Sequence, residues 1–256
     1  MTDERKDQLT AEADGLIEGR NAVIEALRTE ASIDKIFIQK GEVDKTLGHI
    51  ASKARAAGIV VVEADRRKLD GMSRTHAHQG VIALAAVREY VSVDDILADA
   101  AAKNESPLIV VCDEISDPHN LGAIIRTAYC AGAHGVVIPK RRSAGLTSVV
   151  AKTSAGAVSH MKVARVPNNP PLLKDLKKQG VWVFGTAANG TTGLYDTDLK
   201  GAAAIVIGSE GDGMTRLAAE NCDFLVSIPM KGDLNSLNAS ASAAILLYEA
   251  VRQRMN

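Results

Sequence analysis

Apolar stretches alternate with amphipathic stretches along most of the chain, beginning near residue 16. Three segments rich in β-branched residues predict strands, at 33–39 (IDKIFIQ), 58–64 (GIVVVEA) and 78–87 (HQGVIALAAV). Segments 15–28 and 46–58 carry apolar residues at helical spacing and predict helices. Residues 16–88 therefore predict a small α/β domain.

From Leu108 onward the predicted strands are nearly continuous apolar runs, and helical patterns separate them. Such runs are typical of a parallel sheet that helices cover on both faces. We therefore expect an α/β fold with a mostly parallel sheet in this part of the chain. Ligands of such sheets bind beyond the carboxyl ends of the strands. The expected strands lie at 108–112, 135–139, 161–166, 181–185, 203–208 and 224–229.

An acidic, alanine-rich stretch at 89–106 lies between the two patterns and ends before Pro107. It predicts a short helix and a linker, which places a domain boundary there. The expected division is a flexible N-terminus at 1–15, a small domain at 16–88, the linker at 89–106, and a second domain at 107–256.

Composition narrows the possible functions less than the pattern does. The 256 residues include 30 basic and 31 acidic side chains, a formal net charge of −1, which excludes a polycation but permits a local basic patch. No apolar run approaches the roughly 18 residues that span a bilayer, and the charged opening does not resemble a signal peptide. We expect a soluble, cytoplasmic protein without a membrane partner. Cys112, Cys130 and Cys222 lack metal-ligand spacing and predict buried thiols, so no metal site is expected.

The segment after the 108–112 strand contains Asn120, which is a favourable N-cap for the following helix. Arg126 then lies about 9 Å beyond that cap along the helix axis. Because helical side chains lean toward the N-terminus, its guanidinium could reach the end of the sheet. The alternative is a surface arginine on an amphipathic helix.

Basic residues follow the 135–139 strand, at Lys140, Arg141 and Arg142. A triplet of this kind is either a solvated loop or, beside an active-site edge, a contact surface for phosphates. Other basic residues that could extend such a surface lie in the first domain, at Arg66, Arg67, Lys68 and Arg74.

The glycine-rich segment 208–213 (GSEGDG) follows the 203–208 strand and predicts a tight turn close to a ligand. Its spacing is neither G-x-G-x-x-G nor a P-loop, which disfavours a dinucleotide or ATP site. After the 224–229 strand, small polar residues open the last helix. Asn235 or Ser236 can cap this helix, which leaves Asn238 and Ser240 for another role.

Three segments taken together resemble the SpoU class of RNA ribose 2′-O-methyltransferases. They are DPHNLGAIIRTAYCAGAHGVVIP, IVIGSEGDGM and IPMKGDLNSLNASASAAILLYE, in the family's order and spacing. The first domain, with GRNAVIEAL and HQGVIALA, resembles the family's RNA-binding module more loosely. The two-domain form is most similar to the 23S ribosomal RNA guanosine-2′-O-methyltransferases.

This resemblance implies a deep trefoil knot, in which the last helix threads a loop, and a homodimer whose partners complete each active site. It also implies S-adenosylmethionine as the cofactor and 23S ribosomal RNA as the substrate. The implied cofactor contacts are Thr186, Ala187, Gly208, Ile228 and Leu237. The implied catalytic residues are Asn120, Arg126, Glu210, Ser236 and Asn238.

The chemistry of ribose methylation agrees with these residue types. A ribose hydroxyl must lose its proton as it attacks, and a guanidinium offers no acceptor for that proton. Arg126 is therefore expected to bind the adjacent phosphate and stabilise negative charge on the 2′ oxygen. Glu210 would accept the proton or orient Arg126, and the amides and Ser236 would position groups.

Two alternatives remain open from the sequence. One is a transfer RNA ribose methyltransferase of the same superfamily, against which the added first domain argues. The other is a ribosome-associated RNA-binding protein without catalysis, against which the complete catalytic set argues. Measured binding of S-adenosylmethionine would separate the second alternative from an enzyme.

Overall fold

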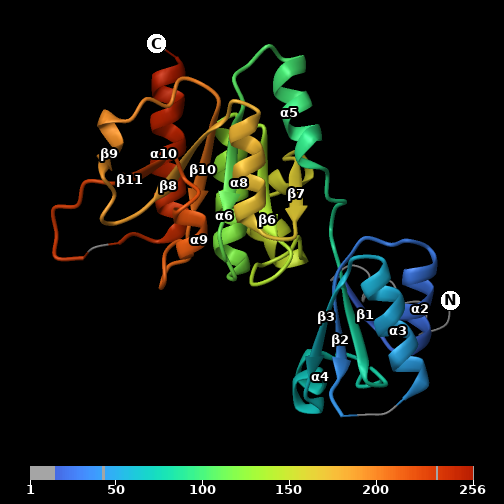
Figure 1. Cartoon of the computed structure of the whole chain (residues 1–256). Coiled ribbons are helices and arrows are strands. Elements are labelled where there is room, and N and C mark those ends of the chain that lie inside the picture. The colour runs from blue at the N-terminus through green and yellow to red at the C-terminus, as the bar shows by residue number, and fades with distance from the viewer. Residues whose placement is uncertain (1–14, 42–43, 235, 256) are drawn as a thin grey trace. The chain divides into compact units, whose positions relative to one another are not determined.

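The computed structural model describes residues 15–41, 44–234 and 236–255 (Figure 1). Contacts divide the chain into two compact units. The first unit comprises residues 1–89 with 145–148, and the second comprises 90–144 with 149–256. The predicted flexible N-terminus, 1–15, lies outside the described residues except for Gly15.

The first unit contains a four-stranded sheet in the order β1-β4-β2-β3. β2 runs parallel to β3, whereas β4 runs antiparallel to both β1 and β2. The elements are β1 (Leu16–Glu18), α2 (Arg20–Arg28), β2 (Ile33–Gln39), α3 (Lys45–Ala56), β3 (Val60–Ala64), α4 (Arg66–Met72) and β4 (Val81–Ala85).

Apolar side chains alternate between the two faces of this sheet. Ile36 packs with helices α2 and α3 on one face, and Phe37 packs with α4 on the other. Helix α3 begins after Asp44, whose carboxylate accepts hydrogen bonds from two backbone N–H groups in the first turn. The helical pattern read at 15–28 was wrong at its start, because residues 16–18 form the edge strand β1.

The second unit contains a seven-stranded sheet in the order β7-β6-β5-β10-β8-β11-β9, in which every neighbouring pair is parallel. Its strands are β5 (Leu108–Cys112), β6 (Gly135–Pro139), β7 (Val163–Val166), β8 (Trp182–Thr186), β9 (Thr192–Gly193), β10 (Ala203–Ile207) and β11 (Phe224–Ser227). Its helices are α5 (Val93–Ala102), α6 (Pro118–Cys130), α7 (Ser148–Thr153), α8 (Asn169–Lys178), α9 (Arg216–Ala219) and α10 (Ala239–Arg254), with short 3₁₀ turns η1 (Ala157–Ser159) and η2 (Leu194–Asp196).

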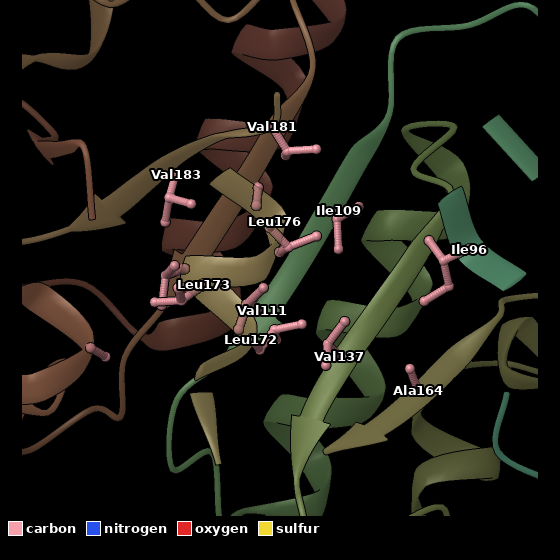
Figure 2. Packing of buried hydrophobic residues seen from close by; sticks show 13 residues of the cluster. Ile96, Ile109, Val111, Val137, Ala164, Leu172, Leu173, Leu176, Val181 and Val183 are labelled. Carbon is pink, nitrogen blue, oxygen red and sulfur yellow. The ribbon is translucent and has the colours of Figure 1, made fainter. Parts of the chain in front are cut away.

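The three strands β5, β6 and β10 are buried on both faces, as their continuous apolar sequences predict, whereas Trp182 of β8 and Phe224 of β11 are exposed. Ile109 and Val111 of β5 point toward α5, α8 and α9, within the cluster drawn in Figure 2. Val110, between them, points to the opposite face, which α6 and α10 cover. The predicted α/β fold with a parallel sheet is confirmed.

The stretch predicted as a linker, 89–106, contains α5, which packs into the core of the second unit. Ile96 is fully buried there, and a Cβ on Gly135 would lie only 2.4 Å from it. The helix begins with a capping box formed by Ser92 and Asp95, and Asp99 forms an ion pair with Lys162 at 2.6 Å. Residues 93–102 therefore belong to the second unit.

No helix among the described residues is long and apolar enough to cross a membrane.

Candidate active site

A pocket of about 530 Å³ lies where β8, β10 and β11 end. Its wall combines the loops that follow these three strands with the segment that opens α10. This position, beyond the carboxyl ends of parallel strands, is where α/β sheets bind ligands. All five residues expected to contact the cofactor line this one pocket: Thr186, Ala187, Gly208, Ile228 and Leu237.

The loop after β10 folds back on itself at the pocket wall. Ser209 and Gly213 exchange two backbone hydrogen bonds, of 2.9 and 3.0 Å. A Cβ on Gly208 would lie 2.2 Å from backbone atoms of Gly213 and Met214, so no side chain fits at this position. The turn carries Glu210 on the pocket wall, as the glycine-rich sequence predicts.

The loop after β8 packs equally closely against the backbone of β11. The backbone N–H of Ala187 donates to the carbonyl of Val226 in β11, at 3.0 Å. A Cβ on Gly190 would lie 2.7 Å from the backbone of Leu225 and Ser227. In this wall the main chains of neighbouring loops therefore pack directly against one another. Such a wall can contact a ligand through main-chain N–H and C=O groups.

Asn238 is the N-cap of α10. Its Oδ1 accepts hydrogen bonds from the backbone N–H groups of Ser240 (2.9 Å) and Ala241 (3.2 Å), and from the Ser240 hydroxyl (2.6 Å). The prediction that Asn235 or Ser236 caps this helix was wrong for Ser236, which precedes the cap and lines the pocket. Asn235 lies outside the described residues.

The amide nitrogen of Asn238 joins the predicted catalytic residues to one another. It donates to the Asn120 Oδ1 at 3.0 Å and also to the carboxylate of Glu210. The three residues come from the start of α6, the turn after β10 and the start of α10. Residues separated by more than 100 positions thus share one hydrogen-bonded cluster at the pocket.

The sequence predicted that Asn120 caps α6, and this prediction was wrong. The cap is Asp117, whose carboxylate accepts from the backbone N–H of His119 at 2.9 Å, and Pro118 takes the first helical position. Asn120 lies within the helix and is buried. Its side chain is therefore available to accept the hydrogen bond from Asn238.

Arg126 stands apart from this cluster. The earlier start of α6 puts it about 13 Å along the axis from the cap, and about 120° around the helix from Asn120. Its side chain is exposed, and no described residue forms a hydrogen bond or ion pair with it. The structure therefore does not bring Arg126 together with the other predicted catalytic residues of the same chain.

The predicted RNA-binding triplet follows β6, at the same edge of the sheet as the pocket. Arg141 is exposed, whereas Arg142 forms an ion pair with Glu114 at 3.1 Å. The Lys140 carbonyl accepts a hydrogen bond from Arg165 at 3.3 Å. Arg141 and Arg142 are therefore both open to solvent, and the charge of Arg142 is paired with Glu114.

Asp113 is a buried residue to which the sequence pattern gave no role. Its carboxylate accepts from the Asn169 side chain (2.7 Å) and from the Thr215 backbone N–H (2.6 Å). It thereby ties the end of β5 to the start of α8 and to the loop that carries Glu210. Its position directly after a buried strand was the available signal, but its two partners are distant in sequence.

Two of the cysteines, Cys112 and Cys222, do not supply a nucleophile for this site. Burial raises the pKa of the Cys112 thiol to about 12 and that of Cys222 to about 12, so both stay protonated at neutral pH. The prediction that all three thiols are buried is confirmed for Cys112 alone, because Cys222 is half-buried and Cys130, at the end of α6, is exposed.

The pocket offers an apolar lining, backbone polar groups and two carboxylates. Ile207, Ile228 and Leu237 supply the apolar surface, and Glu210 and Asp212 supply negative charge. Such a lining fits a ligand that combines a flat apolar ring, polar groups and a positive charge. S-adenosylmethionine has this combination, so the residues present fit that cofactor.

Two family profiles together match most of the chain. The SpoU rRNA methylase family matches residues 107–248, and the RNA 2′-O ribose methyltransferase substrate-binding domain matches residues 16–91. The first match contains the pocket and the Asn120–Asn238–Glu210 cluster.

Relatives of full length agree with these matches. The chain is 46% identical over 236 residues to the "Putative TrmH family tRNA/rRNA methyltransferase YacO" of Bacillus subtilis (strain 168), covering 92% of this chain and 94% of the relative. The SpoU methyltransferase AviRb of Streptomyces viridochromogenes, solved with AdoMet, is 25% identical with a TM-score of 0.61, covering 96% and 92% of the two chains. An AdoMet-bound rRNA methyltransferase of Sinorhizobium meliloti is 25% identical with a TM-score of 0.57, covering 96% and 90%.

The site geometry and both profile matches lead to one conclusion. The chain belongs to the SpoU rRNA methylase family of S-adenosylmethionine-dependent RNA methyltransferases.

Proposed function

We propose that this protein transfers a methyl group from S-adenosylmethionine to the ribose 2′-hydroxyl of a guanosine in 23S ribosomal RNA. The observation that supports this most directly is the hydrogen-bonded cluster of Asn120, Glu210 and Asn238 beside a pocket lined by all five expected cofactor contacts. In this proposal the enzyme works in the cytoplasm.

The cofactor would be held by the loops after β8, β10 and β11, with Ile228 and Leu237 against its apolar parts and Gly208 offering backbone groups. When bound, S-adenosylmethionine supplies an electrophilic methyl group next to a positively charged sulfur. The carboxylate of Glu210, on the same wall, favours that positive charge electrostatically.

Glu210 is the one described member of the cluster that only accepts hydrogen bonds when ionised. We assign it the proton of the ribose hydroxyl, because removing that proton makes the oxygen a better nucleophile. Asn238 donates to Glu210 and to Asn120, so it fixes the direction of the carboxylate. Ser236, on the pocket wall, positions the ribose or the cofactor.

The exposed position of Arg126 supports a homodimer in which this residue acts in the partner's active site. Its guanidinium would bind a phosphate next to the reacting ribose and stabilise charge on the 2′ oxygen. The proposal includes the trefoil knot, in which α10 threads a loop. The packing of α10 against both α6 and β10 is compatible with that path.

A mixed dimer tests the role of Arg126. Arg126→Ala alone should abolish methyl transfer and leave cofactor affinity nearly unchanged. Co-expression with a Glu210→Gln chain should then restore about a quarter of wild-type activity, because half of the dimers would contain one complete site. No restored activity, with mixed dimers present, would assign Arg126 to the site of its own chain.

The share of this chain that the solved structures cover favours ribosomal RNA over transfer RNA as the substrate. The rRNA methyltransferase of Sinorhizobium meliloti covers 96% of this chain. The TrmH/SpoU tRNA modifying enzyme of A. aeolicus covers only 59%, at 26% identity and a TM-score of 0.54. A two-unit chain therefore resembles the rRNA enzyme over nearly its whole length.

The deciding experiment uses labelled S-adenosylmethionine and total RNA from cells that lack this protein. Label in one guanosine of the large ribosomal RNA is the expected result. Label in tRNA would keep the reaction and overturn the substrate. Bound cofactor without any labelled RNA, with intact large ribosomal subunits also unlabelled, would favour a non-catalytic RNA-binding protein.

A further inference from the structure

The first part of the loop that joins α4 to β4 in the first unit is bound by one carboxylate, that of Glu18. Glu18, the last residue of β1, accepts hydrogen bonds from the Ser73 hydroxyl (2.5 Å), the Arg74 backbone N–H (2.9 Å) and the Thr75 hydroxyl (2.7 Å). Partial burial opposes the charge on Glu18, but these hydrogen bonds outweigh it and lower its pKa below the usual value. Glu18 is therefore ionised at neutral pH and fully engaged with this loop.

Further hydrogen bonds fix the other end of the same loop. His78 contacts Asp70 at 2.9 Å through Nε2 and accepts from the Gly80 N–H through Nδ1 at 3.1 Å. The Arg20 Nε donates to the Gln79 carbonyl at 3.0 Å. Both ends of residues 73–79 are thus attached to the rest of the unit.

The backbone of the loop adopts a conformation that side chains seldom occupy. His76 and Gln79 have φ values of 55° and 50°, although neither is a glycine. Such positions persist where the surroundings hold them, and they concentrate at functional surfaces. Here the backbone N–H groups of His76 and Ala77 donate to the hydroxyl oxygens of Ser73 and Thr75, and these hydrogen bonds hold that backbone.

The groups that this scaffold presents outward are basic or polar. Arg74, Thr75 and His76 are exposed, while Ser73 and His78, which anchor the loop, are buried. The preceding helix α4 adds the exposed residues Arg66, Arg67 and Lys68. Segment 65–79 therefore carries four cationic side chains against Asp65 and Asp70, and Asp70 contacts both His78 and, at 4.0 Å, Arg66.

We infer that loop 73–79 and the adjoining face of α4 form a preorganised contact surface for the phosphate backbone of the RNA substrate. Arg74 makes the charged contact, and Glu18 is a positioning residue that holds the loop in its binding conformation. A preformed loop binds more tightly because less conformational freedom is lost on association. This inference rests on the proposed function, since it assigns a second contact region for the same RNA.

The test measures binding of the full-length protein to a transcript of 23S ribosomal RNA over about 50–200 mM salt. Arg74→Ala should bind about tenfold more weakly and reduce the slope of log K against log salt by about 0.7–0.9. Arg55→Ala is the matched control, because Arg55 is an exposed arginine on α3, which covers the opposite face of the sheet. Equal effects of the two variants would overturn the inference.

Glu18→Gln separates loop order from simple charge. The change removes one negative charge, so general electrostatics alone would strengthen RNA binding. Loss of the loop anchor should instead weaken RNA binding severalfold. Glu63→Gln makes the same change of charge at an exposed position on β3 and should not weaken binding. Stronger binding by Glu18→Gln, equal to that of Glu63→Gln, would overturn the positioning role.

Binding of S-adenosylmethionine is measured for every variant and should be unchanged. If Glu18→Gln does not fold, the comparison of Arg74→Ala with Arg55→Ala decides alone. Failure of the wild-type protein to bind or methylate any RNA would contradict the proposed function. Normal methylation with no difference between Arg74→Ala and Arg55→Ala would contradict only the present inference.

Discussion

The two units hold their polar loops in different ways. At the pocket of the second unit, Asn120, Glu210 and Asn238 bind one another, and each comes from a different loop or helix. In the first unit, Glu18 binds three groups of one short loop, and the exposed side chains of that loop point to solvent. Hydrogen bonds through Asn238 fix reacting groups relative to each other, whereas anchors at both ends of loop 73–79 fix a surface for a partner. We therefore expect substitutions in the cluster of Asn120, Glu210 and Asn238 to affect turnover, and those in loop 73–79 to affect RNA affinity.

The largest effect is expected from Asn238→Ala. The substitution removes the donor shared by Asn120 and Glu210, and methyl transfer should fall by about 10²-fold or more. Loss of the cap should also destabilise α10 by about 1 kcal/mol. Single-turnover rates and unfolding measurements check both effects. Asn221→Ala, which removes an amide just after α9 that is not part of the pocket lining, is the control and should keep its rate.

Next in size is the effect of Gly208→Ala on the cofactor. A methyl group at this position would collide with the backbone of Gly213 and Met214, so the pocket wall must shift. Affinity for S-adenosylmethionine should fall by about tenfold or more, which calorimetry can measure. Gly211→Ala lies in the same turn with nothing within 4 Å of its new methyl group and should bind normally. Similar affinities for the two variants would show that the close approach at Gly208 does not shape the site.

A smaller effect is expected when Lys140 and Arg141 are both replaced by alanine. Each lost phosphate contact should reduce the slope of log K for RNA binding against log salt by about 0.7–0.9. Arg142→Ala, whose charge is partly compensated by Glu114, should change the slope less. An unchanged slope in the double variant would show that the RNA does not contact this edge of the sheet.

The smallest effect concerns the attachment of α5. Hydrogen bonds from Lys103 and Lys162 lower the pKa of Asp99 from 3.8 to about 2. Because the folded-state pKa is depressed, this stabilisation is present above about pH 4 and is lost as the pH falls toward 2. Asp99→Asn should therefore cost about 1 kcal/mol at neutral pH, and the difference should vanish in acid. Urea unfolding at several pH values measures it, with the exposed Asp94→Asn in the same helix as control.

Strong local patterns predicted the sheet of the second unit well, because each long strand is an uninterrupted apolar run. The edge strands β1 and β9 were missed, since two or three residues carry no usable period. The start of α6 was misplaced because Asp117 and Asn120 are both good caps, and only Pro118 distinguishes them. The expected reach of Arg126 followed from that misplaced start.

The candidate site could be predicted as a set of residues but not as an arrangement. The five residues expected to contact the cofactor line one pocket, since each lies at or beyond the end of a strand at the same edge of the sheet. The role of Asn238 as both cap and bridge depends on partners in two other elements. The same holds for Glu18 and Asp113, whose partners lie far along the chain, so that no local period reveals them.

The order of strands in the second unit has a consequence for how the chain folds. β5 pairs with β6 on one side and with β10 on the other, and β10 follows β5 by almost a hundred residues. During synthesis, the edge of β5 must therefore stay unpaired until β10 has emerged, while the first unit can already fold from local contacts. The Arg254 guanidinium donates to carbonyls of Ser106 and Pro107, just before β5, and of Leu199, just before β10. It can form these hydrogen bonds only after both strands have been synthesised. An unpaired edge of this length is open to association with other chains, so we expect the slow step of folding to be the one at which this unit depends most on chaperones.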